Sequence, residues 1–184
     1  MFGKVTNYFM LNLIFLIACI PLVTIFPAIA AMYSVLRDWK LHKESAILEP
    51  FMRHFKLNFK QSFIISLLWI PFPVLLYFDF LFIIHLESGW KTLFLVPLFL
   101  IAIVFLSMSI FLFPVMVHYK LGIKDVLKNT FIISLTYYPI TLLQLVISAT
   151  LFTILFFIPT TSVFILGIAA LINFSFCNKV FGRL

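Results

Sequence analysis

Charged residues are scarce in this sequence, at 10% of 184 positions, whereas 64% of the residues are hydrophobic. Soluble globular domains contain roughly 25% charged and 45–50% apolar residues. A water-soluble fold of this length has too little interior to bury the surplus apolar surface. The scarcity of charge therefore excludes a soluble domain of appreciable size and predicts an integral membrane protein.

Signatures of chemistry are also missing. The sequence contains no HExxH, no GxxxxGK[ST], no GxSxG and no paired-cysteine metal pattern. Its two cysteines, Cys19 and Cys177, have no neighbouring ligand set, so we interpret them as buried packing residues. The four histidines are scattered at or beyond the ends of the apolar runs. We expect no catalytic, cofactor-binding or metal-binding residues, no enzymatic activity and no motor for active transport.

Five apolar runs approach or exceed the ~20 residues that a helix needs to cross the hydrocarbon core. They do not alternate as the ~10-residue strands of a membrane barrel do. The runs cover residues 7–36, 62–86, 92–117, 130–158 and 162–177. The sequence therefore predicts an all-α, polytopic membrane helical bundle of about five transmembrane helices, forming a single domain over residues 1–184.

The first run is the least certain, because Pro21 and Pro27 interrupt it. Proline removes a backbone donor and kinks or breaks a helix. A single crossing and a re-entrant hairpin that returns the N-terminus to the cytoplasm both stay open. Lys4, the apolar run and Ala28-Ile29-Ala30 also imitate a secretory signal peptide. The run is longer than the ~7–15 residues of a signal's apolar core, so we interpret it as part of the mature protein.

The basic residues predict an orientation. Eleven of the thirteen lysines and arginines lie in the first and third loops and at the C-terminus, which share one side of a five-span bundle. The positive-inside rule places that side in the cytoplasm and the N-terminus outside. The rule also explains the net charge of +7, so we expect no nucleic-acid partner.

Two segments of the chain resemble each other. Residues 60–71 read KQSFIISLLWIP and residues 128–139 read KNTFIISLTYYP. The polar positions and the proline match as well as the apolar centre, which distinguishes this pair from two chance apolar runs. We interpret the pattern as two parallel two-helix repeats, at about 7–86 and about 92–158, followed by a last helix at about 162–177.

The links inside these repeats are amphipathic. In the first link, three phenylalanines recur every fourth residue, while Arg53, His54 and Asn58 share the other side with lysines. The second link carries a lysine stripe. Such helices lie in the headgroup region, where they anchor to anionic lipid or dock a partner. The candidate partner or lipid interface comprises Phe51, Phe55, Phe59, Lys56, Lys60, Lys120, Lys124 and Lys128.

Few polar side chains fall within the spans, and three of them form the candidate intramembrane polar site: Asp79, Gln144 and Asn173. Asp79 is an interfacial carboxylate, a substrate or proton contact at an outward mouth, or half of a packing ion pair. Gln144 and Asn173 lie on helices that a short loop makes antiparallel neighbours. An interhelical hydrogen bond is the usual role of such residues.

Several of these segments together resemble one family. They are LNLIFLIACIPLVTIFPAIAAMYSVLRDW at the start, FMRHFKLNFKQS in the first link, FP…KDVLKNTFIISL in the second half and FSFCNKVFGRL at the end. They are similar to the YesL-like family of bacterial multi-pass membrane proteins, which carry a domain of unknown function. The family has glycine before the second proline of the first segment, where this chain has Phe26.

The resemblance implies a place in the cell rather than a reaction. Members of the family are often encoded beside carbohydrate-uptake ABC transporters. It therefore implies an accessory membrane subunit in the bacterial cytoplasmic membrane, with sugar ABC permease subunits as partners. A self-contained small-molecule transporter or channel is the alternative, because internal repeats line the pathway in many transporters.

Overall fold

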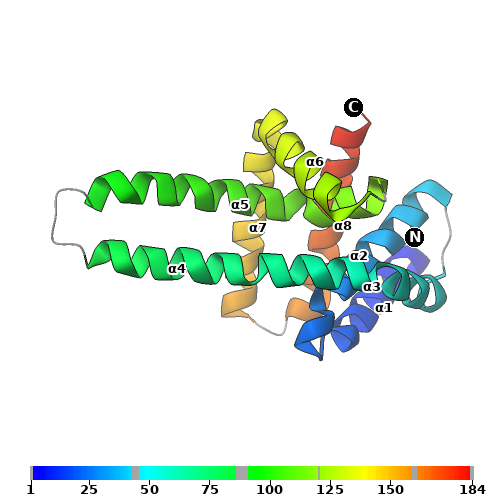
Figure 1. The fold of residues 1–184 in the computed structure, drawn as a ribbon. Coiled ribbons are helices and arrows are strands. Elements are labelled where there is room, and N and C mark those ends of the chain that lie inside the picture. Colours follow the sequence, from blue (N-terminus) through cyan, green and yellow to red (C-terminus); the bar gives the residue numbers. More distant parts are fainter. Residues whose placement is uncertain (1, 43–45, 86–90, 120, 159–160, 183–184) are drawn as a thin grey trace.

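The computed structural model describes residues 2–42, 46–85, 91–119, 121–158 and 161–182, which form helices joined by short connections (Figure 1). No strand occurs in these ranges, so the all-α expectation is confirmed. The elements in chain order are α1 (Phe2–Ala18), η1 (Leu22–Thr24), α2 (Ile25–His42), α3 (Leu48–Trp69), α4 (Pro71–Ile84), α5 (Lys91–Tyr119), α6 (Ile123–Thr136), α7 (Tyr138–Phe157) and α8 (Ser162–Phe181).

Four continuous segments are long and apolar enough to cross a membrane: Leu22–Lys40, Leu48–Ile84, Lys91–Tyr119 and Tyr138–Phe157. Two shorter apolar helices, Thr6–Ala18 and Leu166–Phe181, accompany them. The chain is thus a multi-pass helical membrane protein, as its composition predicts.

The first apolar run is not one helix, which corrects the single crossing expected for residues 7–36. The chain leaves α1 after Ala18, and Pro21 is extended, with φ −76° and ψ 123°. The Thr24 hydroxyl donates to the carbonyl oxygens of Ala18 and Pro21, both at 2.6 Å, and so ties the turn together. Pro27 lies in the first turn of α2, where a backbone N–H has no hydrogen-bond partner within the helix. The proline therefore removes no helical hydrogen bond there.

After this turn α2 runs back along α1. The rings of Tyr8, near the start of α1, and Trp39, near the end of α2, pack edge to face with centroids 5.2 Å apart. The two helices therefore form an antiparallel hairpin, the alternative that the two prolines left open.

α3 and α4 form one long, nearly collinear rod (Figure 1). The break between them lies at Ile70, whose N–H still bonds to the carbonyl of Ser66 at 2.9 Å. Pro71 then begins α4, because a proline at the first helical position removes no helical hydrogen bond. The amphipathic link and the second predicted span are therefore continuous, and the helix starts at Leu48 rather than near residue 62.

The second half has a similar break. α6 ends at Thr136, and Tyr137, with φ −102° and ψ 41°, separates it from α7, which carries Pro139 in its first turn. The predicted span at 130–158 is therefore two helices. The repeated KxxFIISL segment ends α3 and α6, and each break lies just before the proline that follows it, Pro71 or Pro139. The duplication itself stays a prediction from the sequence.

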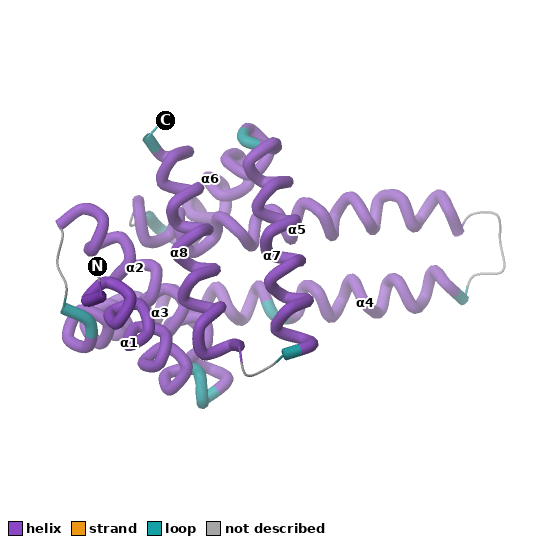
Figure 2. The backbone as a smooth tube through the Cα atoms, turned by 180° about the vertical axis from the view of Figure 1, so that it is seen from behind, coloured by secondary structure: helices purple, strands orange, loops and turns teal. Residues whose placement is uncertain are grey.

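The helices pack into a body and an arm. α7 and α8 lie side by side in the body and run crosswise to α4 and α5, as the view from behind shows (Figure 2). The core centres on α2, where Ala28, Ala30, Ala31 and Val35 are fully buried against α3 and α5. Small side chains at these positions let the helix backbones approach closely.

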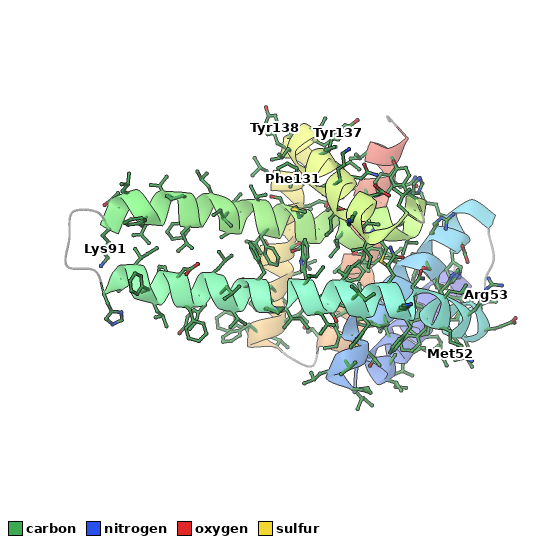
Figure 3. All side chains as sticks on the ribbon, viewed as in Figure 1. Met52, Arg53, Lys91, Phe131, Tyr137 and Tyr138 are labelled. Atoms are coloured by element: carbon green, nitrogen blue, oxygen red, sulfur yellow. The ribbon has the colours of Figure 1, made fainter. Side chains whose placement is uncertain are left out.

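The arm is the hairpin formed by α4 and the first half of α5, which extends away from the body (Figure 1). At its end, the ammonium group of Lys91 donates to the carbonyl oxygen of Ile84 at 2.8 Å and joins the two helices. Figure 3 shows Lys91 at this end and Arg53 at the opposite end of the α3–α4 rod. The arm is thus held by its own side chains rather than by the body.

Candidate functional site

The predicted interface on the links is partly exposed. The four lysines Lys56, Lys60, Lys124 and Lys128 are exposed, and Phe59 is 36% exposed. Lys120 lies outside the described residues. Lys56 and Lys60 lie in the middle of α3 and Lys124 and Lys128 in the first half of α6, so both helices present basic side chains at the surface.

Phe51 does not belong to that surface, which corrects its place in the predicted interface. Its side chain is fully buried, and Phe55 is half-buried. The rings follow one another along α3, with centroids 6.3 Å apart for Phe51–Phe55 and 5.6 Å for Phe55–Phe59. The stripe begins inside the protein because α3 packs against α2.

Two residues predicted on the polar side of α3 also face α2. The His54 Nε2 lies 2.6 Å from the Asp38 carboxylate, and the Asn58 amide donates to the Ser34 hydroxyl at 3.2 Å. Arg53 lies 3.9 Å from the same carboxylate but is 55% exposed. These contacts form a polar seam between α2 and α3. Sequence reasoning missed Asp38 and Ser34, whose only signal is that two polar residues lie one helical turn apart, on one side of α2.

Two further contacts join the links to the end of α5. The Arg37 guanidinium donates to the carbonyl oxygen of Val117 at 3.2 Å. The Gln61 amide donates to the carbonyl oxygen of Leu121 at 2.8 Å. Both carbonyls lie where α5 ends, and such groups lack helical partners. The structure therefore ties the first link to the end of α5, next to the start of the second link.

The predicted partners Gln144 and Asn173 do meet. The Gln144 amide, on α7, donates to the backbone carbonyl of Asn173, on α8, at 3.3 Å. The Asn173 amide donates to the carbonyl of Ile110 on α5 at 3.3 Å, and its oxygen accepts from the Cys177 thiol at 3.1 Å. Gln144 is 2% exposed. The cluster links three helices inside the body.

A cavity of about 290 Å³ adjoins this cluster. It lies among α1, α2, α7 and α8. Its polar lining residues are Tyr33, Gln144, Ser148 and Asn173, and the remainder of its lining is apolar. Tyr33 is 7% exposed, and its ring stacks on Phe113 with centroids 6.4 Å apart. Tyr33 lies in the first of the segments that carry the family resemblance, but nothing in the sequence marked it as part of a polar site.

Asp79 is not brought together with this cluster. It lies on α4, in the arm, and its side chain is exposed. No hydrogen bond or ion pair joins it to another residue in the ranges that the structure describes. The three members of the predicted intramembrane polar site thus separate into a buried pair and a lone carboxylate. Within the same ranges, no group of three or more His, Cys, Asp or Glu side chains is placed to hold a metal ion.

Comparison with known proteins agrees with the resemblance found in the sequence. The family described as "Protein of unknown function, DUF624" matches residues 8–80. The chain is 28% identical over 134 residues to the uncharacterized protein YesL of Bacillus subtilis (strain 168) and 26% identical over 136 residues to the uncharacterized protein YteU of the same organism. These matches support membership of the YesL-like family. No solved structure matches the chain.

The YesL-like matches cover only part of each protein. They include 72% of this chain and 62% of YesL, and 73% of this chain and 61% of YteU. The chain thus spans about three fifths of the length of the relatives that it matches. The region described as DUF624 contains α2, α3 and most of α4, and therefore the polar seam and Asp79, whereas Gln144 and Asn173 lie beyond it.

Proposed function

We propose that this YesL-like chain is a non-enzymatic accessory subunit that binds the permease of a carbohydrate-uptake ABC transporter. The observation that carries the proposal is the uncovered arm. Large apolar side chains of α4 are exposed, among them Leu75 at 60%, Phe78 at 61% and Phe82 at 70%. Within the chain, α4 packs chiefly against α5.

Asp79 favours a protein neighbour for this arm. A carboxylate that lies below the headgroups is costly unless it is paired or reaches water. Asp79 lies five residues before the end of α4, about 7–8 Å along the helix axis, on a helix that is apolar on all sides. A basic or hydroxyl side chain on a partner helix would offset this cost by pairing with the carboxylate. A transmembrane helix of a permease has the required length and chemistry.

The choice of a carbohydrate permease rests on the resemblance, since YesL-like proteins are often encoded beside such transporters. The missing nucleotide-binding motif supports a subunit without a motor. The exposed lysines of α3 and α6 support a cytoplasmic basic face in the bacterial cytoplasmic membrane. With α1 and α2 antiparallel, the same rule places the N-terminus on that cytoplasmic side, instead of outside as a single crossing required. The C-terminus stays cytoplasmic in this proposal.

Purification from native membranes tests the proposal. The full chain is extracted in mild detergent, and the proteins that accompany it are identified by mass spectrometry. We expect permease subunits, and we expect Asp79→Asn to lower their recovery several-fold. Asp125→Asn is the matched control, because Asp125 is also exposed but lies on α6, away from the arm. Recovery of the chain alone in several detergents, or equal losses for both variants, would refute the proposal.

The second candidate is a self-contained small-molecule transporter or channel, favoured by the polar cluster beside the cavity of the body. Liposomes that contain only the purified chain should then take up radiolabelled mono- or disaccharides. Replacing Gln144 by leucine should slow that uptake. Liposomes that exclude all of these sugars would eliminate this candidate.

A further inference from the structure

The cavity of the body is polar at one end and apolar at the other. Gln144 and Asn173 are hydrogen-bonded to each other at the polar end. From there, α7 continues through Leu151 and Leu155 toward the α7–α8 connection, and α8 returns from Leu166. Phe152 also lines the cavity and is 70% exposed, so the apolar end opens to the outside of the bundle. A ligand that fits both ends has a polar head and an apolar chain.

The polar end holds an acceptor without a partner. The Gln144 amide nitrogen donates to the Asn173 carbonyl, but the side-chain oxygen Oε1 is buried and accepts no hydrogen bond. The neighbouring Asn173 amide is already engaged through both its nitrogen and its oxygen. A buried acceptor that has no hydrogen-bond donor is less favourable than one bonded to water, so binding a donor there is favourable. The hydroxyl group of a ligand is such a donor.

The lining also restricts the charge of the ligand. None of the described residues that line the cavity is Asp, Glu, Lys, Arg or His. A charged head would therefore lie in an apolar site without a counter-ion, which is strongly unfavourable. A soluble sugar would lack partners for most of its hydroxyls, since Tyr33 and Ser148 alone contribute hydroxyl groups among the described lining residues. The volume of about 290 Å³ is near the lower limit of ligand cavities, roughly 300–1,000 Å³, and suits a small head with the start of a chain.

We propose that this cavity binds a neutral lipid with a free hydroxyl group, such as a diacylglycerol. The lipid hydroxyl donates to Oε1 of Gln144 after a small rotation of that side chain, close to the hydroxyl of Tyr33. The acyl chain lies along Leu151 and Leu155 and leaves past Phe152 into the bilayer. The site is independent of the arm and of the proposed permease contact.

Photolabelling tests this proposal on the full chain. The protein is placed in nanodiscs of dioleoylphosphatidylcholine, which has no hydroxyl donor, with a diazirine analogue of dioleoylglycerol, and labelled peptides are mapped by mass spectrometry. Dioleoylglycerol and its 3-O-methyl ether then compete with the probe. We expect labels on the facing peptides of α7 and α8. We also expect the free alcohol to compete at about tenfold lower concentration than the ether, as one hydrogen bond implies.

Three variants separate the hydrogen bond from the shape of the cavity. Gln144→Leu has a similar volume without the acceptor, so the alcohol and the ether should compete equally while labelling persists. Gln61→Leu is the matched control on α3 and should leave the tenfold difference intact, because Gln61 bonds to Leu121 and does not line the cavity. Ala169→Phe fills the cavity and should abolish the labels on α7 and α8.

Equal competition by alcohol and ether in the unmodified protein would overturn the assignment. So would labels spread evenly over all lipid-facing helices, or labelling of α7 and α8 that survives Ala169→Phe. If Gln144→Leu fails to fold, the comparison of alcohol with ether and the Ala169→Phe variant still decide the outcome.

Discussion

Replacing Asp38 by alanine should destabilise the protein by removing the contact between α2 and α3. The side chains of Asp38 and His54 are only 13% and 15% exposed, and their atoms approach to 2.6 Å. A hydrogen bond to a charged group contributes roughly 1.5–3 kcal/mol in soluble proteins. Measured interhelical couplings in a membrane protein average ~0.6 kcal/mol and reach ~1.7 kcal/mol. Because this pair is short and largely buried, we expect a coupling energy of about 1–2 kcal/mol.

A double-mutant cycle measures that coupling energy. The free energies of unfolding of the native protein, Asp38→Ala, His54→Ala and the double variant are obtained by titration with sodium dodecyl sulfate in mixed micelles. Arg53 provides the matched control, because it approaches the same carboxylate at 3.9 Å and is 55% exposed. Exposed pairs contribute ~0–1 kcal/mol, so the coupling of Asp38 with Arg53 should stay below about 0.5 kcal/mol. A coupling with Arg53 as large as that with His54 would show that charge, rather than the buried contact, joins these helices.

Two further predictions concern α1. In a variant that lacks both native cysteines and carries Tyr8→Cys together with Trp39→Cys, a short thiol cross-linker should join the two positions in membranes, because the native ring centroids lie 5.2 Å apart. In a single straight helix the same residues would be roughly 46 Å apart, and no cross-link would form. Gly167→Leu should destabilise the protein by about 1–3 kcal/mol in the same titration, because even a Cβ there meets Asn12 at 3.3 Å. Gly122→Leu is the control and should change the free energy of unfolding by less than ~1 kcal/mol, because the nearest atom to its Cβ is an Asp125 oxygen at 3.8 Å. Equal losses of stability in the two variants would refute the close approach of α8 to α1.

Apolar length was enough to predict the membrane class and the positions of α5 and α8, because a continuous apolar run that is long enough has few other stable environments. It was not enough at residues 7–36. A straight helix and a folded hairpin bury similar apolar side chains in the bilayer, so hydropathy does not distinguish them. The decision rests on Pro21 and on the hydroxyl of Thr24, whose bond to the carbonyl of Ala18, six residues earlier, cannot form in a straight helix.

The periodicity of α3 predicted a helix correctly but placed Phe51, His54 and Asn58 at the surface, whereas the structure packs them against α2 or buries them. An aromatic stripe opposite polar residues indicates an interfacial helix when the helix is considered alone. In the structure Asp38 and Ser34 of α2 bind two of those polar residues, and the start of the stripe is buried beside them. The meeting of Gln144 with Asn173 was predictable, because a short connection makes α7 and α8 antiparallel neighbours. The unpaired oxygen of Gln144 depends on the packing of three helices and has no signature in the sequence.

The unequal lengths of the helices have a consequence for the surrounding bilayer. α5 has 29 residues and is about 43 Å long, whereas α7 has 20 residues and is about 30 Å long. A hydrocarbon core of about 30 Å matches α7 along the membrane normal, but it matches α5 only at an inclination of about 45°. Since α7 runs crosswise to α5, a tilt that brings α5 closer to the membrane normal turns α7 away from it. Thin and thick membranes should therefore favour different tilts of the whole molecule, because α5 runs as one helix from the arm into the body and holds the two together.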